Sequence, residues 1–326
     1  DAMLGAEVTD PYNVITKKEV SDKLSNTELK IIDKSQSSYS ETIFSLTSIM
    51  LMDYHQKPDS PKNNDSKSFF PGMLYSMQDK VPLLSYLKTA DSSFIWAAGK
   101  NFVCIPTIFW TCVDSPQEFL PNSLINFYLT TPFPKIVSKI TEIQALPLAS
   151  LNGDKDTINP FLEYIDKNGM PKTPFFAYIH HNIPHGPFRV TSECEPTMYF
   201  PSQPMPKRVF EGYKASYKCA LKTIQMFMEK INNDDPEAIV VFQGDHGMGN
   251  HLILKVSDKE KFLFAGNIFN AIKAPEICFE KYGIPKTNVN TVRFVLNCAY
   301  GFKLPFKENI HFHHDGHGNV IERKIY

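Results

Sequence analysis

Short apolar runs bounded by polar or turn residues recur along the chain and predict buried strands. These runs cover residues 29–32, 94–98, 175–179 and 238–242. Stretches with helical periodicity lie at residues 42–52, 81–89, 213–231 and 289–300. Because strands alternate with helices, we expect an α/β fold with a largely parallel central sheet and helices on both faces.

In sheets of this kind, ligands bind beyond the carboxyl ends of the strands. The residues that follow the predicted strands at 175–179 and 238–242 are therefore the first places to look for chemistry. We expect both strand ends to open on the same edge of the sheet. A site shared between them is the simplest consequence.

Composition and charge exclude several classes of protein. The chain has 326 residues, of which 42% are hydrophobic and 21% charged, which is typical of a folded domain and not of a disordered chain. Its 34 Lys and Arg residues balance 35 Asp and Glu residues, so nucleic acid is not expected as the main partner. No apolar run approaches the ~20 residues needed to span a bilayer, and the first residues do not resemble a signal peptide.

Six cysteines, at positions 104, 112, 194, 219, 278 and 298, form no CxxC pair and no zinc-ribbon spacing. Cys104 and Cys112 are close enough in sequence to be bridged in an oxidising compartment. Free buried thiols are an equally good interpretation of the six residues.

The predicted strand at 238–242 runs into Gln243, Gly244, Asp245, His246 and Gly247. Glycines on both sides allow the backbone to bend, so that the carboxylate and the imidazole can turn toward one point. A carboxylate with an imidazole suits Zn, Mn or Fe. The alternative is a turn in which Asp245 caps a helix and His246 has no role.

The predicted strand at 175–179 is followed by His180, His181 and His185 within six positions, in a loop that also holds two prolines. Histidines held at a strand end can bind an anion or a metal ion. Surface histidines in a proline-rich loop are the alternative, and we favour it for His181.

A run of hydroxyl residues at 37–42 leads into the predicted helix at 42–52 and places Thr42 near its first turn. Unpaired N–H groups and the helix dipole favour a bound anion there. A hydroxyl in that position becomes a nucleophile if a metal ion lowers its pKa. A simple helix cap is the alternative.

With these segments together, the chain resembles the alkaline phosphatase and sulfatase superfamily. More narrowly, it is similar to bacterial sulfatase-like hydrolase and transferase domains related to lipoteichoic acid synthases and phosphoethanolamine transferases. The landmarks appear in the family's order: Asp1, SSYSETIFSLTSIMLMDY at 37–54, FFAYIHHNIPHGPF at 175–188, QGDHG at 243–247 and NVNTVRFVLN at 288–297. The resemblance implies an alkaline-phosphatase-like three-layer sandwich.

The resemblance also implies a set of site residues. Thr42 corresponds to the nucleophile that takes up a phosphoryl-linked group, and one or two divalent ions, Zn or Mn, are held by Asp1, Thr42, Asp245 and His246. His185 corresponds to a ligand for the substrate phosphate or for a second metal ion and to a candidate acid or base, with His180 as its companion. His251 is a further candidate ligand for the second metal ion, by its position alone.

Two features depart from the family's pattern. In the family, an apolar strand leads into the first metal carboxylate, whereas this sequence begins at Asp1 itself. We therefore expect residues 1–326 to form a single catalytic domain that lacks its first strand; the alternative is that Asp1 is not a metal ligand. Sulfatases of the superfamily need a modified Cys or Ser followed by Pro and Arg, and the segments at Cys104 and Cys194 both lack that Arg. Hydrolysis of sulfate esters is not expected.

The histidine-dense tail at 311–318 contains Asp-Gly between two short runs, which predicts a hairpin turn and not a metal site. Arg293 lies on the predicted helix at 289–300. It is expected to fix the packing of the C-terminal segment, with contact to a phosphate as the alternative.

By resemblance, we expect transfer of a phosphoethanolamine- or phosphoglycerol-like group through Thr42, from a phospholipid-type donor to a cell-envelope glycan or lipid. The alternatives are a phosphodiesterase or phosphatase of the same superfamily and a degenerate member that binds anions without turnover. The resemblance also implies a location outside the cytoplasm and near a membrane, through segments that this sequence does not contain.

Overall fold

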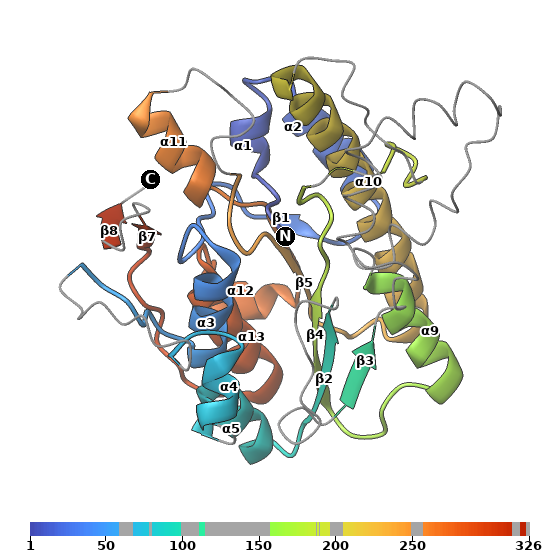
Figure 1. The fold of residues 1–326 in the computed structure, drawn as a ribbon. Helices are drawn as coiled ribbons and strands as arrows, with labels where there is room; N and C mark the ends of the chain where they lie inside the picture. Colours follow the sequence, from blue (N-terminus) through green and yellow to red (C-terminus); the bar gives the residue numbers. More distant parts are fainter. Residues whose placement is uncertain are drawn as a thin grey trace, which may run out of the picture.

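The computed structural model describes residues 1–58, 68–77, 80–98, 111–114, 157–186, 188, 190–195, 205–248, 257–314 and 320–323. Figure 1 shows strands in the middle of the molecule with helices around them. The α/β class expected from the alternation of apolar runs and helical periodicity is confirmed.

A three-stranded parallel sheet carries one side of the site. Its central strand, β2 (Ser93–Ala98), pairs in parallel with β3 (Thr111–Asp114) and with β4 (Phe175–His180). The register places Ala98 opposite His180 at the carboxyl end. As the apolar run predicts, β2 is almost wholly buried.

A second three-stranded sheet has the order β1-β6-β5 and carries the other side of the site. Here β6 (Asn270–Lys273) pairs antiparallel with both β1 (Lys30–Ile31) and β5 (Val240–Gln243). The sequence predicts the strands at 29–32 and 238–242 but not this direction, because a strand's partners are set by tertiary packing and not by its own apolar pattern.

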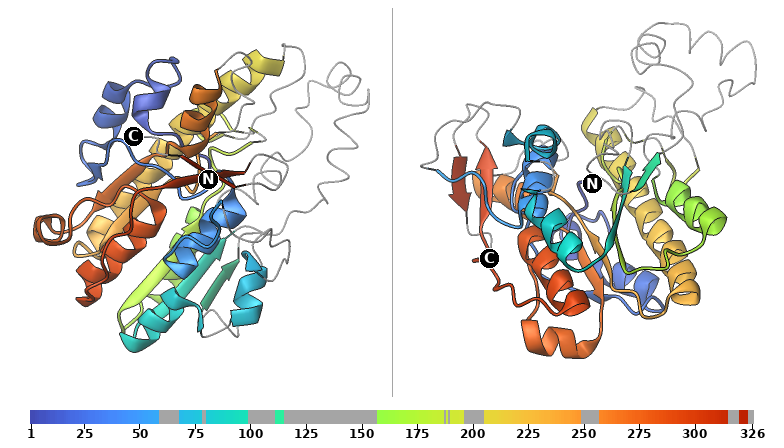
Figure 2. Two further views of the ribbon diagram at one scale, coloured as in Figure 1. Left: turned by 90° about the vertical axis from the view of Figure 1, so that its left-hand side faces the viewer. Right: turned by 90° about the horizontal axis from the view of Figure 1, so that it is seen from below.

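The helices cover both faces of the strands, as Figure 2 shows. They are α1 (Ala6–Thr9), α2 (Lys17–Leu24), α3 (Thr42–Leu51), α4 (Gly72–Met77), α5 (Pro82–Thr89), α9 (Ile158–Asn168), α10 (Met205–Asp234), α11 (Asp258–Gly266), α12 (Glu276–Tyr282) and α13 (Asn288–Tyr300). Helix α10 begins eight residues before the predicted start. Pro206 stands at its second position, where a missing N–H is tolerated, so proline does not stop the helix there.

Alternate side chains of β2 enter two separate apolar cores. Phe94 and Trp96 pack with α3, α5 and α13, whereas Ile95 and Ala97 pack with α9 and α10. This alternation follows from the two-residue period of a strand. Helix, sheet and helix therefore form three successive layers, and strands of the middle layer end at the site.

Two disulfides join described segments: Cys194 to Cys219 and Cys278 to Cys298. Cys112 is also disulfide-bonded. The free-thiol interpretation is therefore wrong for these residues. The spacing of the cysteines in the sequence does not indicate either long-range pair. The pairing predicted between Cys104 and Cys112 involves Cys104, which lies outside the described residues.

The two strands of the predicted C-terminal hairpin are confirmed, because β7 (His311–His314) pairs antiparallel with β8 (Val320–Arg323), whereas the predicted turn lies outside the described residues. Strand β7 packs beside the loop that leads into α3, with Phe312 N–H donating to Ser38 O at 2.9 Å. Among the helices that the structure describes, none combines the length and the apolar character that crossing a bilayer requires.

Candidate metal centre

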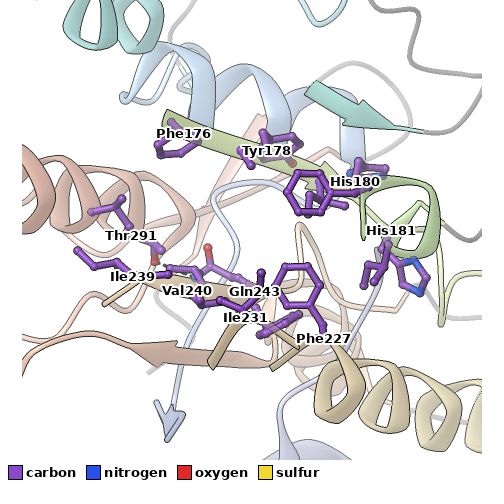
Figure 3. Close-up of a pocket in the computed structure, with 18 of the residues that line it drawn as sticks. Phe176, Tyr178, His180, His181, Phe227, Ile231, Ile239, Val240, Gln243 and Thr291 are labelled. Carbon is purple, nitrogen blue, oxygen red and sulfur yellow. Dashed lines mark hydrogen bonds between the residues drawn. The ribbon is translucent and has the colours of Figure 1, made fainter. Parts of the chain in front are cut away.

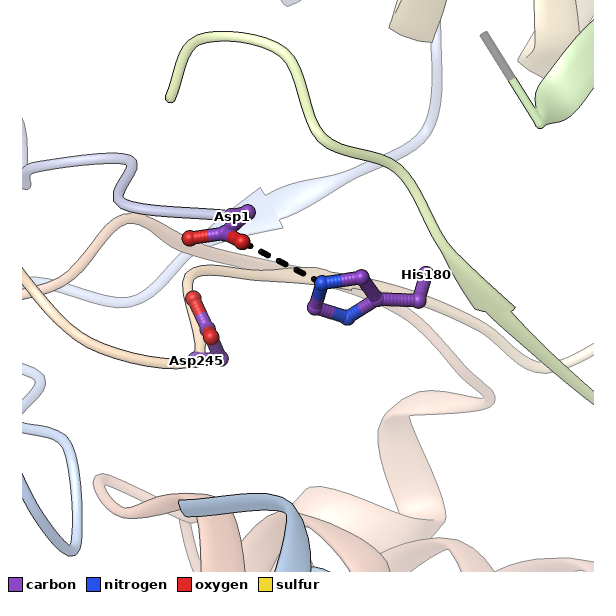
Figure 4. A group of neighbouring side chains, drawn as sticks. All are labelled: Asp1, His180 and Asp245. Atoms are coloured by element: carbon purple, nitrogen blue, oxygen red, sulfur yellow. Dashed lines mark hydrogen bonds and ion pairs between the residues drawn. The ribbon is translucent and has the colours of Figure 1, made fainter. Parts of the chain in front are cut away.

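Three segments distant in sequence meet at the carboxyl ends of β4 and β5. Asp1, His180 and Asp245 each direct one ligand atom inward, and these atoms lie within 4.8 Å of one another. Figure 4 shows the carboxylate of Asp1 facing the ring of His180, with Oδ2 and Nε2 3.2 Å apart. The predicted strand ends therefore open on one shared site, as the sequence indicates.

Asp245 is buried, with 5% of its surface exposed, and only one of its carboxylate oxygens is engaged by hydrogen bonds. Its Oδ1 accepts hydrogen bonds from the backbone N–H groups of Ala2 at 3.0 Å and His246 at 2.9 Å. Its Oδ2 is buried without a hydrogen-bond partner. A buried anionic oxygen in this condition is unfavourable unless a cation completes it.

His246 is held in one tautomer by its own turn. Its Nδ1 lies 2.6 Å from the carbonyl oxygen of Gly247, which can only accept, so Nδ1 carries the proton. The lone pair of Nε2 is then directed into the site, 2.9 Å from Thr42 Oγ1 and 3.4 Å from Asp1 Oδ1. A backbone carbonyl that fixes the far nitrogen of a histidine is the usual support of a metal-binding imidazole.

Glycines beside this pair are required by close backbone packing. A Cβ on Gly247 would lie 2.0 Å from the carbonyl oxygen of Phe264, and one on Gly244 would lie 2.5 Å from that of Met3. The turn carrying Asp245 and His246 can therefore approach its neighbours only because these residues lack side chains. From the sequence, these glycines are expected to let the backbone bend. In the structure, they allow neighbouring backbone carbonyls to lie close to the turn.

Thr42 is the first residue of α3, and Glu41 occupies the cap position without making a side-chain cap bond. The interpretation of Thr42 as a simple helix cap is therefore wrong. The first bond of this helix runs from Ser45 N–H to Glu41 O, which leaves the earlier N–H groups without an intrahelical acceptor. The Thr42 hydroxyl thus lies at a helix end that favours negative charge.

The protonation states fit a cation site. Burial lowers the pKa of His180 to about 3, so its ring is neutral near pH 7. Burial alone would raise the pKa of Asp245, but its interactions with His246, the amino terminus and His180, together with the hydrogen bond from Ala2 N–H, hold it well below its usual range. The site therefore presents the Asp245 carboxylate with the neutral imidazole of His180, and such donors suit Zn²⁺ and similar ions.

The other predicted histidines lie at different distances from the centre. His185 is exposed, and its ring centroid is 6.3 Å from that of His246, at right angles to it. Its Nδ1 lies 2.6 Å from the carbonyl oxygen of Gly186. His181 is partly buried, with Nδ1 3.5 Å from Thr157 N, so it is not the surface residue that we expected. His251 lies outside the described residues.

Asn288, at the start of α13, connects the two halves of the site and was not predicted. Its Oδ1 accepts from Ser38 N–H at 2.8 Å, and its Nδ2 donates to Gly244 O at 3.0 Å. One side chain therefore ties the loop before Thr42 to the turn before Asp245. The only signal in the sequence is its place in the motif at 288–297, which does not indicate a contact.

Arg293 has the packing role that the sequence favours. Its Nε and one terminal nitrogen donate to Met52 O, and the other terminal nitrogen donates to Pro305 O. Met52 ends α3 in a left-handed conformation, so the guanidinium fixes the end of the helix that begins with Thr42. The fork points at backbone carbonyls and not into the metal centre.

Part of this site lies within the match to a known protein family. The family model described as Sulfatase matches residues 54–262, which is more than half of the chain. The chain belongs to the Sulfatase family. The matched span includes His180, Asp245 and His246 of the centre, whereas Asp1 and Thr42 precede it. The comparison with curated proteins gave no match.

Solved structures extend the comparison to the fold. The C-terminal periplasmic domain of EptC from Escherichia coli aligns over 99% of this chain and 90% of its own, with TM-score 0.54 and 11% identity. That of the phosphoethanolamine transferase EptC from Campylobacter jejuni aligns over 93% and 88%, with TM-score 0.52 and 11% identity. The lipoteichoic acid synthase LtaP from Listeria monocytogenes aligns over 87% and 66%, with TM-score 0.49 and 15% identity. At these identities the first two likenesses show a shared fold.

Proposed function

We propose that the chain is a metal-dependent enzyme that transfers a phosphoryl-linked group through a covalent intermediate on Thr42. The observation that carries the proposal is the 2.9 Å contact between Thr42 Oγ1 and His246 Nε2, beside the carboxylates of Asp1 and Asp245 at the start of a helix. A hydroxyl, a cation site and a helix amino end at one point are the components that phosphoryl transfer requires.

The residues fit a divalent ion, because the Oδ2 atom of Asp245 is buried without a hydrogen-bond partner and faces carboxylate and imidazole donors. Asp1, Asp245, His246 and Thr42 would hold the ion, and His180 is placed to join them. Such an ion, Zn or Mn by its donor set, acts as a Lewis acid on a phosphoryl oxygen.

In the first step, the Thr42 hydroxyl gives up its proton and its oxygen bonds to phosphorus, while the bond from phosphorus to the leaving alcohol oxygen breaks and that oxygen takes up a proton. In the second step, an acceptor alcohol gives up its proton and its oxygen bonds to phosphorus, while the Thr42 oxygen leaves and regains a proton. The first turn of α3 stabilises the charge that develops near Thr42. His185, near His246 and exposed, is our candidate for moving the protons.

The substrates that we propose are a phospholipid-type donor and a glycan or lipid acceptor of the cell envelope. The C. jejuni neighbour is named a phosphoethanolamine transferase, which supports a phosphoryl-linked group as the group that is transferred. Sulfate esters are not proposed, because the segments at Cys104 and Cys194 lack the arginine of the sulfatase signature. Nucleic acid is not proposed either, because the chain's net charge is -1.

A location outside the cytoplasm, near a membrane, is part of the proposal. The two long-range disulfides are typical of oxidising compartments, and both EptC neighbours are periplasmic domains. Recovery of the chain from outside the cytoplasmic membrane with both disulfides formed would support this location. Recovery from the cytoplasm with reduced thiols would contradict it.

The test is hydrolysis of a chromogenic phosphodiester with Zn or Mn, comparing the unchanged chain with Thr42→Ala and Thr42→Ser. We expect Thr42→Ala to lower kcat at least about a thousandfold and Thr42→Ser, which keeps a hydroxyl, to retain measurable turnover. Thr89→Ala, at the exposed end of α5, is the matched control. Full activity of Thr42→Ala would refute the nucleophile, and absence of activity with either metal would favour an anion-binding member without turnover.

Transfer and hydrolysis are separated by adding an alcohol. We expect label from the donor to appear on an added alcohol in preference to water. Release to water alone at every alcohol concentration would make the chain a phosphodiesterase of the same family.

A further inference from the structure

Helix α13 holds α3 from both ends. Near the start of α3, Asn288 Oδ1 accepts a hydrogen bond from Ser38 N–H at 2.8 Å, four residues before Thr42. At the far end, the Arg293 guanidinium donates to Met52 O at 3.0 and 2.8 Å. The helix that begins with the proposed nucleophile is therefore fixed to one other helix at each of its ends.

The contact at Ser38 is transmitted to the start of α3. The N–H group of Ser38 is held by Asn288, and its carbonyl oxygen accepts from Phe312 N–H at 2.9 Å. The next carbonyl oxygen, that of Tyr39, accepts from Ser45 Oγ in the first turns of α3 at 3.0 Å. Tyr39 and Ser45 are both fully buried. A shift of the loop at Ser38 would therefore move the start of the helix.

Asn288 also holds the turn that carries the metal ligands. Its Nδ2 donates to Gly244 O at 3.0 Å, directly before Asp245, and lies 3.2 Å from Gln243 Oε1. Only 1% of the surface of Asn288 is exposed, so water does not readily replace these bonds. One buried amide thus connects the loop before Thr42 to the turn before Asp245.

A chain of hydrogen bonds fixes the orientation of the Asn288 amide. Thr291 Oγ1 donates to Thr287 O at 3.0 Å, so it accepts from Gln243 Nε2, which lies 2.9 Å away. Gln243 and Thr291 both line the cavity in Figure 3 and point toward each other there. The Gln243 oxygen then faces Asn288 Nδ2, which leaves Asn288 Oδ1 to face Ser38 N–H.

We infer that Asn288 is a positioning residue that sets the place of Thr42 relative to Asp245 and His246. The 2.9 Å contact between Thr42 Oγ1 and His246 Nε2 depends on how two segments separated by 204 positions lie against each other, and Asn288 is bonded to both segments. A misplacement of about 1 Å at a reacting group can cost about 100-fold in rate. The inference rests on the proposed function, because it concerns the step at Thr42.

Asn297 of the same helix supplies a matched control. It is as buried as Asn288, with 2% of its surface exposed. Its Oδ1 accepts from Leu304 N–H at 2.8 Å, and its Nδ2 donates to Leu304 O at 2.9 Å. These bonds hold the segment that follows α13 and not the metal centre. Asn288→Ala and Asn297→Ala therefore remove the same kinds of bond, and only the first removes them from the site.

The kinetic test is made with metal at saturation and a chromogenic phosphodiester. We expect Asn288→Ala to lower kcat by about 10- to 100-fold with KM within about twofold of the unchanged chain. Asn297→Ala should leave both constants within about twofold. Tm should fall in both variants, because each loses two buried hydrogen bonds.

Asn288→Asp tests the connection if the alanine variant does not fold. It keeps the shape and the acceptor for Ser38 N–H, but it places an oxygen where Nδ2 donates to Gly244 O. Residue 288 is the first of α13, where a negative charge is favourable to the helix. We expect the same loss of kcat as for Asn288→Ala.

Bound Co²⁺ reports the same geometry without turnover. In Thr42→Cys, a thiolate that coordinates Co²⁺ gives a charge-transfer absorption, which requires residue 42 to lie within bonding distance of the ion. We expect this absorption in Thr42→Cys and in its combination with Asn297→Ala. It should be weakened or lost in the combination with Asn288→Ala.

Two kinds of result would overturn the inference and leave the proposed function intact. One is an equal effect of Asn288→Ala and Asn297→Ala on kcat and on the Co²⁺ absorption. The other is a rise in KM of about tenfold with unchanged kcat, because Asn288 would then bind substrate. Absence of turnover in the unchanged chain, together with absence of the absorption in Thr42→Cys, would refute the proposed function itself and the inference with it.

Discussion

Thr42 and His246 are separated by 204 positions in the sequence, yet Oγ1 of the one lies 2.9 Å from Nε2 of the other. Two local features produce this contact. Helix α3 begins at Thr42, and the carbonyl of Gly247 fixes the His246 ring with its lone pair toward that hydroxyl. The pair joins the proposed nucleophile to the cation site, and the predictions below test the groups around it.

The carboxylate of Asp245 is expected to bind the metal ion. Asp245→Asn removes the charge and retains the shape, so the affinity for Zn measured by calorimetry should fall at least about 100-fold. Asp22→Asn, on the exposed side of α2, should leave the affinity unchanged. Equal affinities for the two variants would exclude Asp245 as a ligand.

His185 is expected to act on protons and not to maintain the fold. His185→Ala should lower kcat toward a phosphodiester by about 100-fold and remove one limb of its pH profile, because a general acid or base contributes that amount. Its Tm should stay within about 2 °C of the unchanged chain, since His185 is exposed. An unaltered pH profile would end this assignment.

Acid should destabilise the metal-free chain through His180. Burial lowers its pKa from the model-peptide value of 6.5 to about 3, so between these values the unfolded chain binds a proton that the folded chain does not. The free energy of unfolding should therefore fall as the pH drops from about 6.5 to about 3, with a slope of up to about 1.4 kcal/mol per pH unit. The low pKa of Asp245 acts in the same direction below about 4.

Urea unfolding in the presence of a chelator measures this dependence. His180→Asn should give a flatter curve over the same range, because asparagine does not titrate. An equally steep curve for the variant would assign the acid sensitivity to other groups.

Arg293 is expected to stabilise the fold without binding substrate. Arg293→Lys loses the forked contact with Met52 O, so the free energy of unfolding should fall by about 1–3 kcal/mol. KM for a phosphodiester should stay within about twofold of the unchanged chain. A tenfold rise in KM with unchanged stability would instead indicate that Arg293 contacts the substrate phosphate.

The sequence alone determined the local elements and the chemistry that they carry. Apolar runs gave the positions of β2, β4 and β5 to within two residues, because burial of a short segment is encoded by its own side chains. The position of Thr42 at a helix start and of Asp245 and His246 at a strand end followed from the same local pattern. These features need no knowledge of distant contacts.

The tertiary structure decided the features that depend on contacts between segments distant in the sequence. The antiparallel pairing of β6 with β1 and β5, the disulfide between Cys278 and Cys298, and the place of His180 beside Asp1 each join segments that are separate in the sequence. Hydrophobic periodicity reports that a residue is buried but not what buries it, so only the folded chain shows which strand ends meet.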